Sequence, residues 1–193
     1  TEGWHLYNDV DAKPIWAAID GILTCDPLNG NGEHGDLVSD QSYENYDFTF
    51  EWKMTESGNS GVFVNVHENE EFEEAWFTGP EYQLLDASNK DFSIEEKRSG
   101  CLYGYAPQLT PTPTKDVGEW NTARIIQENG KIEFYLNGNL TAKADFNSQE
   151  WKDYVANSGF KNFPQFGAST KGHITLQEWT SPVWFRNLKI KEL

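Results

Sequence analysis

Alternation of apolar and polar residues predicts strands over much of the chain. The clearest case is residues 46–54, where apolar side chains at positions 48, 50, 52 and 54 alternate with polar ones. Successive side chains of a strand point to opposite faces of a sheet, so this segment has one face in a core and one in water. Residues 183–190 are apolar on both faces for part of their length, which is typical of a central strand.

Turn signals between apolar runs predict hairpins. Asp20-Gly21 separates two such runs and indicates a second strand over 22–25. Asn137-Gly138 is the strongest hairpin signal in the chain, and it predicts a strand over 131–136 with a return strand over 139–143.

The rest of the pattern predicts one helix and several further strands. Ser148 can cap a helix over 148–156, because apolar residues follow at helical spacing. Residues 100–105 are predicted to form a strand. Many short strands with polar turns and a single helix favour an all-β, two-sheet jelly-roll sandwich with one short helix. No repeat or linker divides the chain, so we expect a single jelly-roll domain over 1–193.

Composition and charge narrow the classes of partner. The net charge is −16, which disfavours nucleic acid and anionic lipid. No apolar run is long enough to span a bilayer, so we expect no transmembrane segment. Aromatic residues make up 15% of the chain. Most of these rings should be core, but rings can also cover the apolar faces of a sugar, and a neutral small molecule, such as a neutral sugar, is the expected partner.

Three predicted strands carry a polar or mixed face beside an apolar one. They cover residues 61–67, which follow a predicted tight turn at 58–61, residues 81–86 and residues 173–178. If these strands are neighbours, their mixed faces form the floor of a groove. That floor would contain Glu81, Gln83, Asn65, His67, His173 and Gln177. The alternative is that these faces are the solvent-exposed sides of antiparallel strands.

The chemistry that the residues allow is limited. The chain has no nucleophile elbow and no zinc-ligand spacing. Cys25 and Cys101 can pair in an oxidising compartment, although their surroundings do not resemble a disulfide scaffold. General acid–base catalysis remains, with Glu81 as the best single candidate. Ordinary glycosidases need two carboxylates on the groove, and Asp86 faces away from Glu81 in a regular strand.

The chain resembles a bacterial family first catalogued as a domain of unknown function and later named 3-keto-disaccharide hydrolase. The resemblance covers nearly the whole chain, and its motifs occur in the family's order. The motifs are Tyr46-Asp47-Phe48, Asn59-Ser60-Gly61-Val62, Gly79-Pro80-Glu81-Tyr82-Gln83-Leu84-Leu85-Asp86, Gly118-Glu119-Trp120-Asn121, Asn137-Gly138, Gly172-His173-Ile174, Leu176-Gln177 and Val183-Trp184-Phe185-Arg186-Asn187.

This resemblance implies a concanavalin A-like jelly roll and an enzyme that acts on glycosides already oxidised to a ketone at C3. It also implies a periplasmic or extracellular location, with a signal peptide removed. The implied reaction removes the C2 proton and eliminates the C1 leaving group. Glu81 and His173 are the expected catalytic residues. The expected substrate-binding residues are Asn59, Asn65, His67, Gln83, Tyr103 and Gln177. No cofactor is specified, and a divalent cation is left open.

The chain departs from the family pattern at Asn65, at Glu178-Trp179-Thr180 and at Ser158-Gly159-Phe160. These departures are compatible with altered specificity or with lost activity. A non-catalytic carbohydrate-binding module on the same fold is therefore the alternative function. Ordinary glycoside hydrolysis ranks third.

Overall fold

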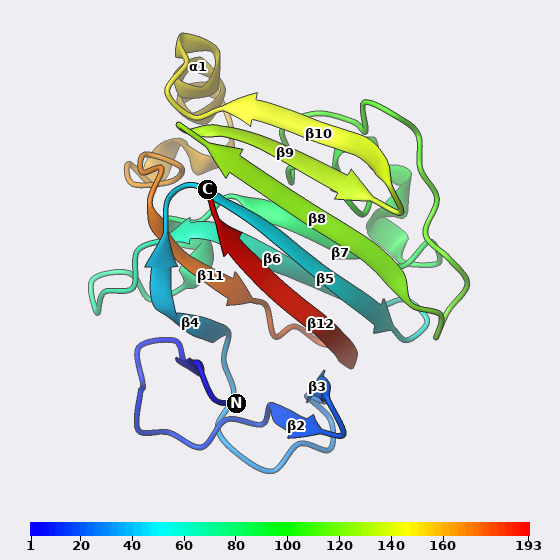
Figure 1. The fold of residues 1–193 in the computed structure, drawn as a ribbon. Coiled ribbons are helices and arrows are strands. Elements are labelled where there is room, and N and C mark those ends of the chain that lie inside the picture. The colour runs from blue at the N-terminus through cyan, green and yellow to red at the C-terminus, as the bar shows by residue number, and fades with distance from the viewer.

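Two antiparallel sheets pack face to face in the computed structural model, which describes residues 1–193 (Figure 1). The five-stranded sheet contains, in spatial order, β1 (Trp4–Leu6), β4 (Leu37–Tyr43), β11 (Gly172–Leu176), β6 (Asn59–Val66) and β7 (Glu81–Leu85). The seven-stranded sheet contains β10 (Asn139–Asp145), β9 (Lys131–Leu136), β8 (Asn121–Glu128), β5 (Tyr46–Met54), β12 (Val183–Glu192), β3 (Ile22–Cys25) and β2 (Ala17–Ile19). The predicted two-sheet jelly roll is confirmed.

The helical segments are short and lie outside the two sheets. They are α1 (Gln149–Asn157) and the 3₁₀ turns η1 (Ala75–Phe77), η2 (Lys90–Ser93), η3 (Glu95–Lys97) and η4 (Gly159–Asn162). Ser148 caps α1 as predicted, since its hydroxyl oxygen accepts a hydrogen bond from the backbone N–H of Trp151. No helix is both long and apolar enough to cross a membrane.

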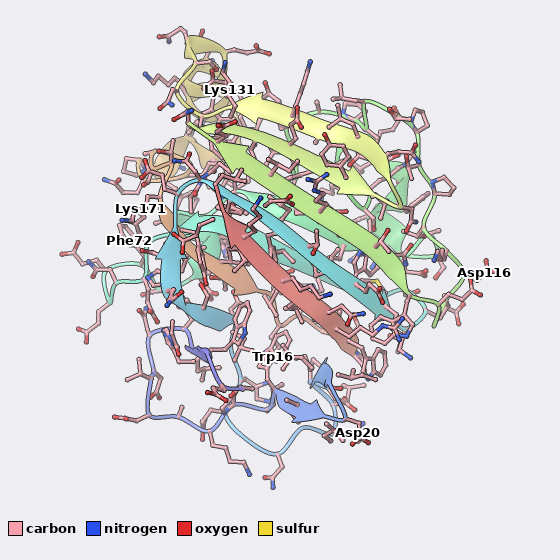
Figure 2. The ribbon with its side chains drawn as sticks, viewed as in Figure 1. Trp16, Asp20, Phe72, Asp116, Lys131 and Lys171 are labelled. Carbon is pink, nitrogen blue, oxygen red and sulfur yellow. The ribbon has the colours of Figure 1, made fainter.

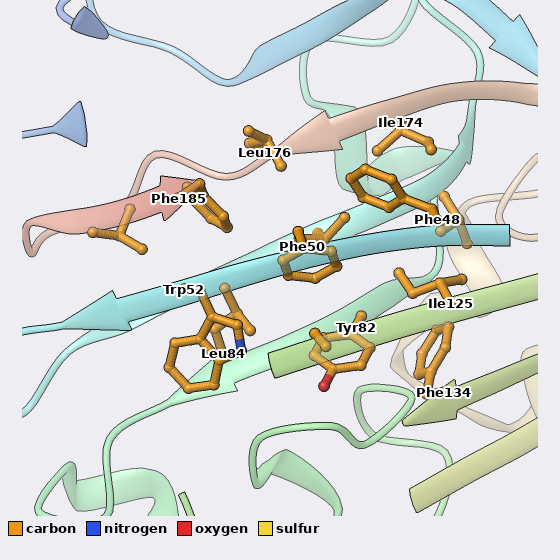
Figure 3. Close-up of a cluster of buried hydrophobic side chains, with 14 of the residues drawn as sticks. Phe48, Phe50, Trp52, Tyr82, Leu84, Ile125, Phe134, Ile174, Leu176 and Phe185 are labelled. Carbon is orange, nitrogen blue, oxygen red and sulfur yellow. The ribbon is translucent and has the colours of Figure 1, made fainter. Parts of the chain in front are cut away.

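The core lies between the two sheets and contains 28 buried residues (Figure 3). The predicted alternation along β5 is confirmed, because its even-numbered residues are all buried. The Phe50 ring lies 5.8 Å from Tyr82 of β7 and 6.1 Å from Phe185 of β12, measured between ring centroids. The contact with Tyr82 joins the two sheets, and the contact with Phe185 links neighbouring strands of the seven-stranded sheet. Large aromatic side chains such as these contribute most per residue to apolar burial.

The hairpins at Asp20-Gly21 and Asn137-Gly138 are confirmed. The predicted strand over 100–105 is wrong, because Gly100 and Gly104 adopt φ of 78° and 71° and turn the chain. The predicted tight turn at 58–61 is also wrong, since β6 already begins at Asn59. Strand β4 was not predicted, because its second half is polar and exposed and therefore lacks the alternating pattern.

The three mixed-face strands are neighbours, in the order β11, β6, β7. Phe63 of β6 pairs with Glu81 on one side and with Thr175 on the other. Tyr82, Leu84, Ile174 and Leu176 point into the core between the sheets. Glu81 and Gln83 therefore project from the outer face of the five-stranded sheet, as the alternation predicted.

A β-bulge changes which face the end of β6 presents. Residues 63 and 66 of β6 pair with residues 175 and 173 of β11, so β6 carries one extra residue. Asn65 adopts φ of 56° at this point and turns inward. Its side-chain Nδ2 donates to Gln127 Oε1 of the opposite sheet at 2.7 Å, and only 2% of Asn65 is exposed. The predicted position of Asn65 on the outer face is therefore wrong.

The outer face of the five-stranded sheet is partly covered by the segment 67–78. Phe63, Val66 and Ala75 form a second small apolar cluster there, with Tyr7 and Trp76 against it. The Tyr7 hydroxyl donates to the carbonyl oxygen of Phe72 at 3.0 Å and ties the segment to the N-terminal strand. In Figure 2, Phe72 and Lys171 lie on one side of the sandwich, opposite Asp116.

The bulge generates a prediction about stability. Asn65→Ala should lower the free energy of unfolding by about 3 kcal/mol. The change leaves Gln127 Oε1 buried without a donor, and it places alanine, which adopts positive φ less readily than asparagine, at a position with positive φ. Chemical denaturation of both proteins measures the difference. The matched control is Asn129→Ala, an exposed site with φ of 52°, where only the backbone cost of about 1 kcal/mol should appear. Equal losses at the two positions would show that the buried amide pair contributes nothing.

Candidate functional site

A pocket of about 260 Å³ lies on the outer face of the five-stranded sheet. Four polar residues, Asn59, Glu81, Gln83 and Gln177, form its floor on β6, on β7 and just past the end of β11. Aromatic residues form its walls: Phe63, Trp76, Tyr103, Phe160, Phe166 and Trp179. The volume lies just below the usual range for ligand sites, so the pocket can enclose about one sugar ring.

The pocket brings together five residues that the sequence predicted, namely Asn59, Glu81, Gln83, Tyr103 and Gln177. Tyr103 reaches it without belonging to a strand. Its backbone N–H donates to the Glu81 carbonyl oxygen at 3.0 Å, because the segment after η3 pairs along the free edge of β7.

Three predicted residues lie elsewhere. His173 shares the outer face of β11, but its Nδ1 lies 2.7 Å from the carbonyl oxygen of Ser39 and it does not line the pocket. His67 lies beyond the bulge, with Nε2 3.2 Å from the carbonyl oxygen of Lys171. Asn65 is buried between the sheets. Strand alternation correctly placed His173 on the outer face, but it could not show that the pocket forms near the other end of β11.

Glu81 lies across Gly61 of the neighbouring strand. A Cβ atom at position 61 would come within 2.0 Å of Glu81 Oε1, so only glycine leaves room for this side-chain position. The Gln83 amide faces two acceptors, and hydrogen-bond chemistry therefore assigns its nitrogen to that side. In this orientation it donates to Glu81 Oε1 at 2.8 Å and to the Ser60 carbonyl oxygen at 3.1 Å.

Burial raises the pKa of Glu81 well above its ordinary value. The nearby Asp36 carboxyl group raises this pKa further, and the Lys97 ammonium opposes the shift. A carboxyl group with such a pKa can hold or take up a proton at a pH where an ordinary glutamate is fully ionised. Glu81 is therefore suited to proton transfer.

Asp36 is a functional candidate that sequence reasoning missed. It comes directly before β4, a strand that was not predicted, and its Oδ1 accepts a hydrogen bond from the backbone N–H of Glu178 at 2.9 Å. Burial raises the pKa of Asp36 to about 8. A second carboxyl group that favours its neutral form therefore lies within electrostatic range of Glu81.

Most of the aromatic walls were also missed, because apolar residues in loops show no periodicity. The Phe160 and Phe166 rings stack in parallel with centroids 3.8 Å apart. Trp76 contacts Phe77 and Phe163, each with centroids 4.7 Å apart. These contacts hold both walls in place, so the pocket is largely preformed.

Other chemistry-bearing groups do not assemble around this pocket. Cys25 and Cys101 are both free and buried, so the structure contains no disulfide between them. Nowhere do three or more His, Cys, Asp or Glu side chains converge as a group that could hold a metal ion.

Comparison with known proteins places the chain in a family. The model of the family described as "3-keto-alpha-glucoside-1,2-lyase-like domain" matches residues 1–191. The chain belongs to this family. The expected family membership is thereby confirmed over almost the full sequence.

Individual relatives agree with this assignment. The chain is 28% identical to a Bacteroides thetaiotaomicron protein named "3-keto-disaccharide hydrolase", covering 99% of this chain and 74% of that protein. A crystal structure from Parabacteroides distasonis, titled as a "putative glycosyl hydrolase", superposes with a TM-score of 0.89 at 30% identity and covers 99% of this chain and 88% of that one. The Bacillus subtilis carbohydrate-binding module CBM66 has a TM-score of 0.58 at 12% identity, covering 98% of this chain and 96% of that one, and shares the fold.

The contact between Gly61 and Glu81 generates a second prediction. Gly61→Ala should displace the Glu81 carboxyl group toward solvent and lower its pKa toward the ordinary value, because the new methyl group occupies the position of Oε1. A crystal structure of the variant and NMR titration of the glutamate measure the two effects. Gly159→Ala is the control, since a Cβ there meets no atom within 4 Å. An unmoved carboxyl group in Gly61→Ala would contradict the role given to Gly61.

The raised pKa of Asp36 generates a third prediction. Its folded-state pKa of about 8 exceeds the ordinary value of 3.8, so its contribution to stability is complete below pH 3.8 and is lost as the pH rises through about 8. Asp36→Asn removes this loss. Between pH 5 and pH 9 the wild type should lose about 4 kcal/mol more of its unfolding free energy than the variant, because about three pH units of this window lie below the folded pKa and each costs about 1.4 kcal/mol. The corresponding extra fall in Tm is about 12 °C. Parallel Tm profiles would refute the shift, and the exposed Asp11→Asn serves as the control.

Proposed function

We propose that the protein cleaves glycosides whose sugar ring carries a ketone at C3. The observation that carries this proposal is a pocket for one sugar ring with a single carboxyl group of raised pKa on its floor, surrounded by amides. Family membership and the name of the Bacteroides relative support the same substrate class.

The reaction is an elimination followed by addition of water. The C3 ketone acidifies the hydrogen on C2. A base takes this proton, the C2–H electron pair forms the C1–C2 double bond through an enolate, and the C1–O bond breaks. The departing oxygen takes a proton and leaves as an alcohol. Water then adds across the double bond, so the sum of the steps is hydrolysis of the glycoside.

Glu81 is the residue proposed to move the proton. In its ionised form it accepts the C2 proton, and the resulting neutral carboxyl group can donate a proton to the leaving oxygen. A pKa raised by burial suits both steps, because the group is then a stronger base than an ordinary glutamate and is stable when protonated. This use of one carboxyl group does not require the carboxylate pair of ordinary glycosidases.

The amides of the floor are proposed to bind the sugar. Asn59, Gln83 and Gln177 present side-chain N–H and C=O groups that can hold hydroxyl groups or polarise the C3 ketone. Negative charge develops on the ketone oxygen in the enolate, so a preformed N–H donor at that oxygen would lower the barrier. His173, His67 and Asn65 have no part in this set, since none lines the pocket.

A non-catalytic sugar-binding role is the second candidate function. The aromatic walls favour it, because rings bind the apolar faces of sugars without any need for a base. The two functions differ in whether Glu81 is needed for bond cleavage. The periplasmic or extracellular location expected from the sequence stays a prediction.

The decisive experiment compares a 3-keto-glucoside with the matching unoxidised glucoside. Release of the aglycone from the keto form alone would support the proposal. Glu81→Gln should then lower kcat/KM by about 10²-fold or more, because the amide cannot accept the C2 proton. Glu73→Gln, at an exposed site outside the pocket, is the control and should retain wild-type turnover.

The remaining outcomes are equally informative. Binding of both glucosides without cleavage of either would favour the sugar-binding function. Cleavage of the plain glucoside would indicate ordinary glycoside hydrolysis. Full turnover in Glu81→Gln would remove Glu81 from the mechanism.

A further inference from the structure

One tryptophan at the pocket mouth is exposed. Trp179 is 52% exposed, and none of the other seven tryptophans is among the exposed large apolar residues. It lines the pocket, whereas the exposed apolar residues elsewhere, such as Leu109, do not. A large apolar ring in water at the edge of a ligand site leaves a surface that a ligand can cover.

The backbone around Trp179 is held on both sides. Gln177 N–H donates to the Gly61 carbonyl oxygen at 2.9 Å, and the Ser60 hydroxyl donates to the carbonyl oxygen of Gln177 at 2.8 Å. Beyond Trp179, the Ser181 hydroxyl accepts from the backbone N–H of Asn59 at 3.0 Å.

Glu178 adds a clamp between this segment and the loop before β4. Its backbone N–H donates to Asp36 Oδ1 at 2.9 Å, and its carboxylate lies 2.6 Å from His34 Nδ1 and accepts from the backbone N–H of Gly35. The segment that carries Trp179 is therefore ordered before any ligand binds. Ordering of a surface segment in advance reduces the entropy lost on binding.

Polar and apolar groups occupy different parts of this pocket. The side chains able to bind several sugar hydroxyls are all on the floor, at Asn59, Glu81, Gln83 and Gln177. The walls offer only the Tyr103 hydroxyl and indole N–H groups beside apolar rings. A second sugar ring in the mouth would find few side-chain partners for its hydroxyls, whereas a flat apolar group has no hydroxyls to pair and can cover the exposed indole face.

We propose that Trp179 forms an aglycone subsite that selects glycosides with an aromatic leaving group. This inference rests on the proposed function, because it assigns the sugar ring to the polar floor and the leaving group to the mouth. Trp179 is a specificity-determining residue in this arrangement and takes no part in proton transfer. The aromatic ring of the substrate would contact the indole face, as aromatic pairs in proteins do.

The test uses benzyl and methyl 3-keto-glucosides. Both leaving groups are simple alcohols of similar acidity, so the chemical step is matched and only the ring differs. The wild type should favour the benzyl compound in kcat/KM. Trp179→Ala should lower the benzyl-to-methyl ratio by about 5-fold, and Trp179→Phe should restore part of it. Leu109→Ala, exposed and outside the pocket, should leave the ratio unchanged.

Two results would overturn the subsite. One is an unchanged ratio in Trp179→Ala. The other is a loss confined to a 3-keto-disaccharide, which would mean that a second sugar occupies the mouth. If no 3-keto-glucoside is cleaved at all, the proposed function fails, and calorimetric affinities of the same two compounds then decide the inference separately. Tighter benzyl binding that depends on Trp179 supports the subsite, and equal affinities refute it.

Discussion

The close approach of Glu81 to Gly61 is the contact on which the pocket depends. Pairing of β6 with β7 sets Gly61 opposite Gln83, and the absent side chain leaves the space that the Glu81 carboxyl group occupies. Gln83 then donates to Glu81 from the same strand, and Gln177 bonds to the backbone of Gly61 from the other side. The three strands thus converge on one residue that has no side chain. Burial of the carboxyl group, and hence its raised pKa, follows from this geometry.

Two kinds of surface meet above that contact. The floor comes from regular strands, whose hydrogen-bonded ladders hold the amides and the carboxyl group at defined spacings. Apart from Phe63 of β6, the walls come from loops and short helical turns that are held by ring contacts, such as the parallel stack of Phe160 on Phe166. Polar recognition therefore rests on the backbone framework, while the apolar surround rests on side-chain packing. A change in wall shape need not disturb the floor.

Strand alternation predicted much of the fold and the centre of the site. It placed Glu81 and Gln83 on one face of β7 because this edge strand pairs in regular register with β6. It failed at Asn65, because an extra residue in β6 reverses the face of the sheet to which the side chain points. The alternation of apolar and polar residues does not reveal such a bulge. It could not find Asp36 or Trp179, because both are loop residues: Trp179 lines the pocket and Asp36 acts on Glu81 only through the tertiary fold.

The bulge in β6 also lies between two parts of the outer face. Residues before it carry the pocket floor, and residues after it continue into the acidic segment that covers the far half of the outer face. The side chains of β6 change faces at Asn65. A change in the length of the segment after Asn65 would therefore leave the pairing of Asn59 and Gly61 with β7 unchanged. Loop 68–74 ends two residues before the pocket wall at Trp76, so a change in its length would act on the wall and leave the strands of the floor in register.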